Sequence, residues 1–214
     1  MNAQITIQVL IAAGIHPTQA KQFADPLSAA MALFAIDTPA RIAPFIGQTA
    51  VESNLFQALE ENLHYSSAQR LCEVWPSHFT SLAAAVPYLG NPRLLANYVY
   101  ANKNGNGDIA SGDGWVFHGR GLIDITGRAN YLRIAQIAQR PYIDHPELLA
   151  QPSDACLSAA AFWTSRNLNA LADAGSIDAI TRVVNGPAML QADRRRTIAE
   201  AVNRALTEQL GALA

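Results

Sequence analysis

Three glutamates that lie close together in the sequence can supply acid and base chemistry. Glu52 is followed eight and nine residues later by Glu60 and Glu61. Hydrolysis of a glycosidic bond usually needs two carboxyl groups, one that protonates the leaving oxygen and one that activates a water or attacks the sugar. Adjacent Glu60 and Glu61 should point to different sides of the chain. Only one of them can therefore be the partner of Glu52, and the other is expected to be a solvated carboxylate.

The segment that carries Glu52 has the pattern of an apolar helix. Ile42, Phe45, Ile46 and Thr49 recur at helical spacing and predict one buried face. At about 100° per residue, Glu52 falls at the edge of that face. Partial loss of water there favours the protonated form that a general acid needs. The alternative is a surface glutamate at a helix C-terminus, where the helix dipole makes a carboxylate mildly unfavourable.

A single straight helix cannot bring Glu52 to its partner. Nine residues would place Glu61 roughly 13 Å further along the axis and about 180° around it. We therefore expect the chain to leave the helix after Glu52 and turn back, which Asn54 and the aperiodic stretch behind it permit.

The rest of the chain indicates one mostly α-helical domain over residues 1–214, with at most a small β-hairpin. Helical spacing predicts two helices within 4–36 and a third that begins at Thr38 and Pro39. The Gly-rich segment 104–118 is expected to be a loop. Further helices are predicted at 66–75, 77–86, 91–103, 130–139, 153–167, 176–184 and 190–210.

Composition argues against several other classes of protein. Half of the residues are hydrophobic, 15% are charged and the formal net charge is −2, so nothing favours nucleic acid as a partner. No segment is long enough to span a membrane. The five histidines form no zinc motif, and Asn104–Trp115 departs from a calcium-binding loop, so we expect neither a metal nor a cofactor. Cys72 and Cys156 do not make a disulfide framework.

The first apolar patch, from Ile5 to Ile15, has no basic start and no cleavage pattern, so it is expected to be a helix and not a signal peptide. This predicts synthesis in the cytoplasm and action in the periplasm or cell wall after release, for example through a holin. We also expect a monomer.

Three segments resemble the signatures of the family-19 glycoside hydrolases, a family of chitinases and phage endolysins. They are PFIGQTAVESNLFQALEENLHYS (Pro44–Ser66), YVYANKNGNGDIASGDGWVFHGRGLIDITGRANY (Tyr98–Tyr131) and VVNGPAMLQADRR (Val183–Arg195), which cover about a third of the chain in the order of the family. The second segment resembles the endolysin branch. The resemblance implies a lysozyme-like helical fold of two lobes with a central cleft, and a polysaccharide as the partner.

The resemblance also implies the catalytic roles. Glu52 would be the general acid, and Glu61 would be the general base that activates water. Thr126 would help to hold that water. The family inverts the anomeric centre, which requires carboxyl groups about 6.5–9.5 Å apart so that a water fits between them.

The implied sugar cleft has two walls. Asn130 and Tyr131 would line one, and Asn185 and Arg194 would belong to the other, with Arg194 tuning a carboxylate. At least two residues of the basic run Arg194–Arg196 are expected to be solvated.

The chain departs from the family pattern at three positions. Val51 stands where the family has His, Pro187 replaces a Gly, and Asp124 stands where Gln is usual. Asp124 matters most, because an amide both donates and accepts hydrogen bonds whereas an ionised carboxylate only accepts. A third acid in the cleft also raises the pKa values of neighbouring carboxyls, so Asp124 is expected to alter substrate preference and pH optimum.

Rings in and near the second signature are further candidates for sugar contacts. Trp115 can stack on a pyranose ring, whereas Phe117 is expected in the core. His64 lies two residues after Asn62, near the expected cleft. Arg120, between two glycines, is expected to be a structural hydrogen-bond hub.

The sequence thus predicts an endo-acting, inverting glycosidase that cleaves β-1,4 linkages between amino sugars of bacterial peptidoglycan. A chitinase that acts on N-acetylglucosamine polymers is the alternative, because the family includes both and the catalytic residues do not separate them. A glycan-binding protein that has lost catalysis is the third hypothesis, and only Val51 and Asp124 support it.

Overall fold

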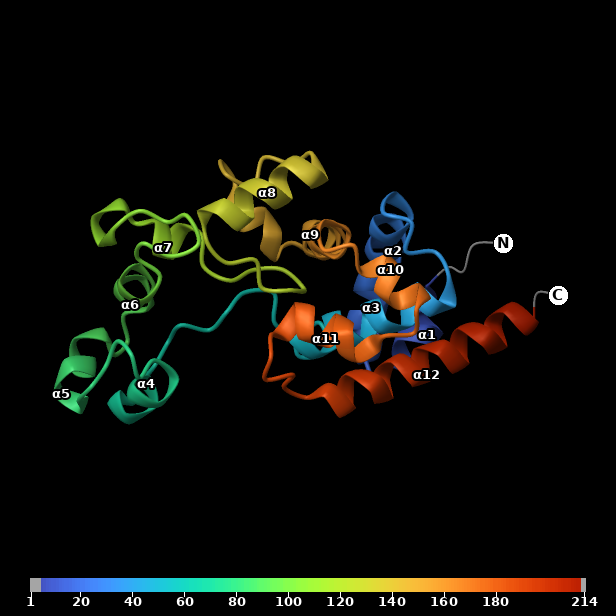
Figure 1. Cartoon of the computed structure of the whole chain (residues 1–214), viewed down its shortest axis with the longest axis horizontal. Helices are drawn as coiled ribbons and strands as arrows, with labels where there is room; N and C mark the ends of the chain where they lie inside the picture. The colour runs from blue at the N-terminus through green and yellow to red at the C-terminus, as the bar shows by residue number, and fades with distance from the viewer. Residues whose placement is uncertain (1–4, 213–214) are drawn as a thin grey trace.

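The computed structural model describes residues 5–212, and residues 1–4 and 213–214 of the predicted domain lie outside that part. The fold is mostly helical and lysozyme-like, as predicted (Figure 1). Within the described residues, pairing of extended segments is limited to two isolated bridges, Glu60 with Arg120 and Arg120 with Ile125. None of the helices in this part of the chain combines the length and the apolar character needed to cross a membrane.

The helices alternate with short turns along the chain. In order they are α1 (Ile7–Ala12), α2 (Pro17–Leu33), α3 (Pro39–Glu52), α4 (Ala68–Val74), α5 (Leu82–Ala85), the 3-10 turn η1 (Val86–Tyr88), α6 (Pro92–Val99), η2 (Ile109–Ser111), α7 (Asp113–Val116), α8 (Arg128–Ala138), η3 (Pro146–Ala150), α9 (Pro152–Ser165), α10 (Leu168–Asp173), α11 (Ile177–Asn185) and α12 (Ala192–Gly211).

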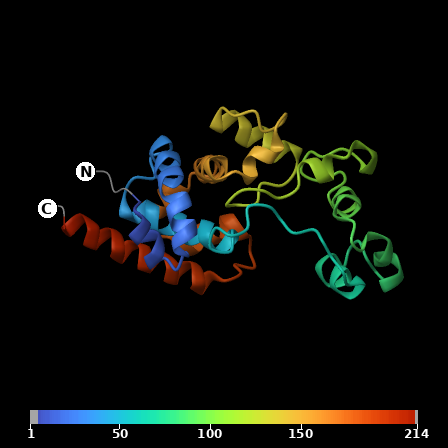
Figure 2. The same cartoon turned by 180° about the vertical axis from the view of Figure 1, so that it is seen from behind.

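The larger lobe is built around α3. This helix begins at Pro39, where a proline suits the first helical position, and it packs along α12 and beside α10 and α11. Helix α1 packs on α2 and α12, and α2 packs on α9 (Figures 1 and 2). In its core the ring of Phe45 meets Trp163 edge-on, with ring centroids 5.4 Å apart. Val51, which replaces the family's His, lies in the same core.

The contact between α3 and α12 depends on a glycine. A Cβ atom on Gly47 would lie 2.7 Å from the carbonyl oxygen of Arg195 and 3.2 Å from the Cβ of Ala199. The absence of a side chain therefore lets the two backbones approach closely, and this sets the position of α12 beside the end of α3.

The smaller lobe contains α4 to α7. The chain leaves α3 and runs in an extended form to α4, which separates these helices from the larger lobe (Figure 1). The lobe has its own apolar cluster, with Leu71, Phe79, Leu95 and Val99 buried at its centre. A third cluster, around Phe117 and the residues of α8, η3 and α9, joins the two lobes.

The Gly-rich segment 104–118, predicted to be a loop, contains two short helical turns. It contains η2 and α7, and the buried carboxylate of Asp113 organises it. Asp113 accepts a hydrogen bond from the backbone N–H of Gly107 at 2.9 Å and two from Arg128 at 2.6 and 2.8 Å. The hydrogen bonds of Asp113 therefore hold this segment together and join it to the start of α8.

Candidate active site

Helix α3 ends at Glu52, and the chain then turns back as predicted. Asn54, Leu55 and Phe56 have φ angles of 48°, 58° and 64°, which place three consecutive residues in the left-handed region. The turn is held by the hydroxyl of Ser53, which donates to the carbonyl of Thr49 and accepts from the N–H of Phe56. Such a run is costly for non-glycine residues and persists only where the surroundings fix it.

The carboxyl of Glu52 is held by residues from the C-terminal part of the chain. Its Oε1 accepts a hydrogen bond of 2.5 Å from Arg195, and the amide of Asn185 lies 3.4 Å from the same oxygen. Its Oε2 has no hydrogen-bond partner among the described residues. The sequence predicts that Glu52 lies at the edge of an apolar surface. In the structure its Oε1 is instead held by polar side chains, and its Oε2 makes no hydrogen bond to the described residues.

Arg195 is a buried residue that joins α12 to α3. Its side chain is 2% exposed, and besides Glu52 it donates to Oε1 of Gln48 at 2.7 Å and to the carbonyl of Leu190 at 3.2 Å. Gln48 is itself buried and donates to the hydroxyl of Thr181. Every buried polar group of this network is thus satisfied, as an interior of low dielectric requires.

The prediction that Arg194 tunes a carboxylate is wrong. Arg194 is exposed, and the one hydrogen bond that it donates within the described part of the chain goes to the side chain of Gln191. Arg195 makes the contact with Glu52, because it shares the buried face of α12 with Ile198 and Val202, at spacings of three and seven residues. The two neighbours of Arg195 in the basic run do not share that face.

Glu61 is anchored by both carboxylate oxygens. Its Oε1 accepts from the N–H of Gly119 at 2.6 Å, and its Oε2 accepts from the hydroxyl of Tyr100 at 2.7 Å. The N–H of Glu61 in turn donates to the carbonyl of Gly119. Burial, followed by the charge of Glu61, raises the pKa of Tyr100, so its hydroxyl stays a donor at neutral pH.

Glu60 points to the other side of the chain, as predicted for adjacent glutamates. Its Oε1 lies 2.7 Å from Nε2 of His118 and 2.8 Å from Nε of Arg120. Desolvation raises the pKa of Glu60, but the charge of Arg120 and the two hydrogen bonds outweigh it and lower the pKa overall. Glu60 thus holds in place the segment that presents the N–H of Gly119 to Glu61.

Arg120 is a structural hub, and Tyr131 belongs to the core. Arg120 donates to Glu60, to the carbonyl of Val116 and to the hydroxyl of Tyr131. The prediction that Tyr131 lines the cleft is wrong for its side chain, which is fully buried, contacts the buried ring of Phe117 and donates to the carbonyl of His118. A large aromatic ring gains more by filling this core than by facing solvent.

Asp124 and Thr126 lie on the face of Gly119 beside Glu61. A Cβ atom on Gly119 would lie 3.2 Å from both Cγ of Asp124 and Oγ1 of Thr126. Asp124 reaches solvent within a concave part of the surface that protein surrounds. Desolvation, and then the charges of Glu61 and Glu52, raise its pKa to about 7. The charges of both glutamates contribute to this shift, so Glu52 and Glu61 lie within electrostatic reach of Asp124.

The remaining predicted contacts divide between two hollows. Asn130, which donates to the carbonyl of Thr126, lines a hollow of about 60 Å³ with Asp124. His64 and Trp115 line a hollow of about 290 Å³ with Glu61, and Trp115 stacks on His118 with centroids 4.8 Å apart. Trp115 therefore offers a ring next to the second carboxyl.

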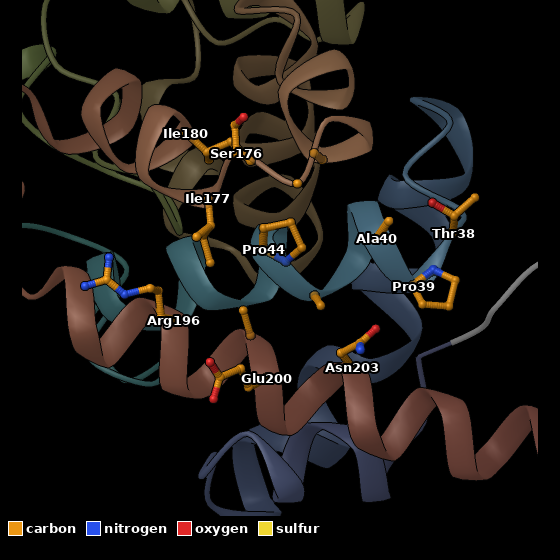
Figure 3. Close-up of a pocket in the computed structure, with 14 residues that line it drawn as sticks. Thr38, Pro39, Ala40, Pro44, Ser176, Ile177, Ile180, Arg196, Glu200 and Asn203 are labelled. Atoms are coloured by element: carbon orange, nitrogen blue, oxygen red, sulfur yellow. The ribbon is translucent and has the colours of Figure 1, made fainter.

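A larger apolar pocket of about 630 Å³ lies elsewhere, between α3, α11 and α12 (Figure 3). Its walls are mainly small and apolar, and Glu52, Glu61 and Asp124 are not among the residues that line it. Within residues 5–212, no group of three or more His, Cys, Asp or Glu side chains could hold a metal ion.

Three residues of the site were missed by the sequence interpretation. Tyr100 and Gly119 lie inside the second signature, but nothing in their types tells which atoms they contact. Arg195 could have been found, because the apolar residues of 190–210 place it on the buried face of that helix.

A helical fold that presents two anchored carboxyl groups from separate segments is the arrangement expected of a glycoside hydrolase. A protein of Haemophilus influenzae (strain ATCC 51907 / DSM 11121 / KW20 / Rd), described as a glycosyl hydrolase family 19 domain-containing protein, is 38% identical to this chain over 145 residues. The match covers 67% of this chain and 70% of that relative. No protein-family model matches the chain. The chain belongs to glycosyl hydrolase family 19.

Proposed function

We propose that the protein is an endo-acting glycosidase that cleaves β-1,4 linkages between amino sugars of bacterial peptidoglycan, with inversion at the anomeric carbon. The observation that carries the proposal is the different anchoring of two carboxyl groups that both lie within electrostatic reach of Asp124. Glu52 keeps one oxygen free, whereas both oxygens of Glu61 accept hydrogen bonds. A free oxygen suits an acid that must reach the sugar, and a fully accepting carboxylate suits an ionised base.

In this mechanism, Oε2 of Glu52 gives its proton to the oxygen of the leaving sugar. Glu61 takes a proton from a water that attacks the anomeric carbon from the opposite face. Thr126 lies beside Gly119 and thus near Glu61, where its hydroxyl can orient that water. The bond between the anomeric carbon and the leaving oxygen breaks as the new carbon–oxygen bond to water forms, which inverts the centre.

Peptidoglycan is the preferred substrate class because residues 98–131 resemble the endolysin branch of the family. That segment supplies Tyr100, Gly119, Asp124 and Thr126, so the resemblance lies on residues that surround Glu61. Chitin is the competing substrate, since the two glutamates would act in the same way on either polymer.

The test is release of reducing ends from purified peptidoglycan and from chitin oligomers by the native protein and by Glu52→Gln. General acid catalysis contributes about 10²–10⁴-fold, so Glu52→Gln should lose activity in that range. Glu208→Gln, an exposed change on α12, is the matched control and should behave like the native protein. Turnover of chitin alone would identify the protein as a chitinase. If the native protein cleaved neither polymer, the enzyme proposal would fail and glycan binding would be the remaining hypothesis.

A further inference from the structure

Asp124 is a carboxyl that no hydrogen bond of the described residues uses. Glu60, Glu61, Asp113 and Asp154 all accept hydrogen bonds from named partners, whereas Asp124 accepts and donates none. It nevertheless reaches solvent, and it lies against Gly119, whose N–H donates to Glu61. A polar group that is free, accessible and placed there is available to the substrate.

The groups around Asp124 do not favour a negative charge. Glu52 and Glu61 both disfavour ionisation of Asp124, and the nearby Tyr100 already donates its proton to Glu61. Two arginines line the same hollow, but Arg133 binds the side chain of Asn130, and Arg166 lies over the ring of Phe162. Among residues 5–212, no cation forms an ion pair with Asp124, and neighbouring carboxylates raise one another's pKa values.

Resting on the proposed function, we propose that Asp124 binds the sugar chain as a neutral carboxylic acid, donating a hydrogen bond to an acceptor oxygen of the substrate while Glu61 is ionised. The acceptor is a hydroxyl or an N-acetyl carbonyl, because an amino-sugar polymer offers these. Protonated Asp124 has one O–H donor and one carbonyl acceptor, the same pair that a side-chain amide presents. Above about pH 7 the donor is lost, in line with the raised pKa.

Binding to insoluble peptidoglycan tests the proposal without requiring turnover. Cosedimentation at pH 5 and pH 8 would compare the native protein with Asp124→Asn, Asp124→Leu and the control Asp25→Asn, which removes the same charge from an exposed site on α2. Native binding should weaken from pH 5 to pH 8, and Asp124→Asn should lose that weakening. Asp124→Leu should bind about tenfold more weakly than Asp124→Asn at both pH values, as expected for one lost hydrogen bond.

The pH profile of kcat/KM gives a second readout. Above pH 7 the ratio of kcat/KM for Asp124→Asn to that of the native protein should rise to about tenfold and then level off, because the variant keeps the one hydrogen bond that ionised Asp124 loses. If Asp124 acted only as a repulsive charge, its removal would let the general acid ionise more readily, and the ratio would fall instead. A falling or flat ratio, or loss of binding in Asp124→Asn at pH 5, would overturn the proposal.

Thermal unfolding separates this proposal from the enzyme assignment. The folded pKa of about 7 lies above the value of 3.8 for a free aspartate, so between these values only the folded chain holds the proton. Stability from this group therefore falls as pH rises through that window. Asp124→Asn should gain in Tm over the native protein from pH 5 to pH 8, and Asp25→Asn should not. This measurement does not depend on enzyme activity. If the difference in Tm between Asp124→Asn and the native protein were the same at pH 5 and pH 8, Asp124 would be ionised at neutral pH and the proposal would fail.

Discussion

Arg195 holds Glu52 and Gln48 with two different nitrogens of one guanidinium. Its Nη2 lies 2.5 Å from Oε1 of Glu52, and its Nη1 lies 2.7 Å from Oε1 of Gln48. Removing one partner of a buried ion pair leaves an uncompensated charge and costs roughly 3–5 kcal/mol. We expect Arg195→Met to lower the free energy of unfolding in that range, measured by urea denaturation.

A double variant identifies the source of that loss. If the unpaired carboxylate is responsible, Arg195→Met combined with Glu52→Gln should be less destabilised than the sum of the two single variants. Arg194→Ala is the matched control one residue away. It removes an exposed guanidinium and should change stability by no more than about 0.5 kcal/mol. Additive effects of the two changes would show that Arg195 acts by packing alone.

Gly47→Ala should strain the contact that places Arg195. The new methyl group would meet the carbonyl oxygen of Arg195 at 2.7 Å, and this neighbour is backbone that cannot turn aside. Overpacking of this kind costs about 1–3 kcal/mol. Urea denaturation should show the loss, and Gly211→Ala, with nothing within 4 Å of its added Cβ, should not. Equal stability of both variants would mean that α12 can shift freely.

The helices whose apolar residues recur at helical spacing could be predicted from the sequence, and so could the turn after Glu52. The sequence did not reveal α7, η2 or α10, because helices of four, three and six residues are too short to show a period. It predicted opposite directions for Glu60 and Glu61 from their adjacency alone. The partners of these carboxyls could not be predicted, since Tyr100 and Gly119 reach Glu61 through tertiary packing across 39 and 58 residues.

The assignment of Tyr131 shows the same limit. Its place in a signature next to Asn130 suggested the cleft, but successive residues of α8 point about 100° apart. Asn130 faces the hollow that contains Asp124, while Tyr131 faces the core. A motif therefore indicates which segment forms the site, and the helix phase decides which of its residues do.

Tyr100→Phe should impair the reaction more than the fold. The change removes the hydroxyl that donates to Oε2 of Glu61 at 2.7 Å and leaves the ring in place. Hydrogen bonds to charged groups contribute about 1.5–3 kcal/mol, so kcat on peptidoglycan should fall by roughly 10–100-fold. Tyr65→Phe is the control, because the Tyr65 hydroxyl makes no hydrogen bond to the described residues. An unchanged kcat in Tyr100→Phe would show that Gly119 alone orients Glu61.

Asp113→Asn should make stability less dependent on pH in the acid range. Hydrogen bonds from Arg128 lower the pKa of Asp113, and they outweigh the desolvation that raises it. A folded pKa below the unfolded value of 3.8 means that this carboxylate stabilises the fold above about pH 4 and loses that effect as pH falls through the folded pKa. The variant should therefore melt below the native protein at pH 7, and the gap in Tm should narrow towards pH 2.5. Asp25→Asn, on an exposed face, controls for loss of one charge. A gap that stays constant over this range would show that Asp113 acts through the shape of its contacts and not through its ionisation.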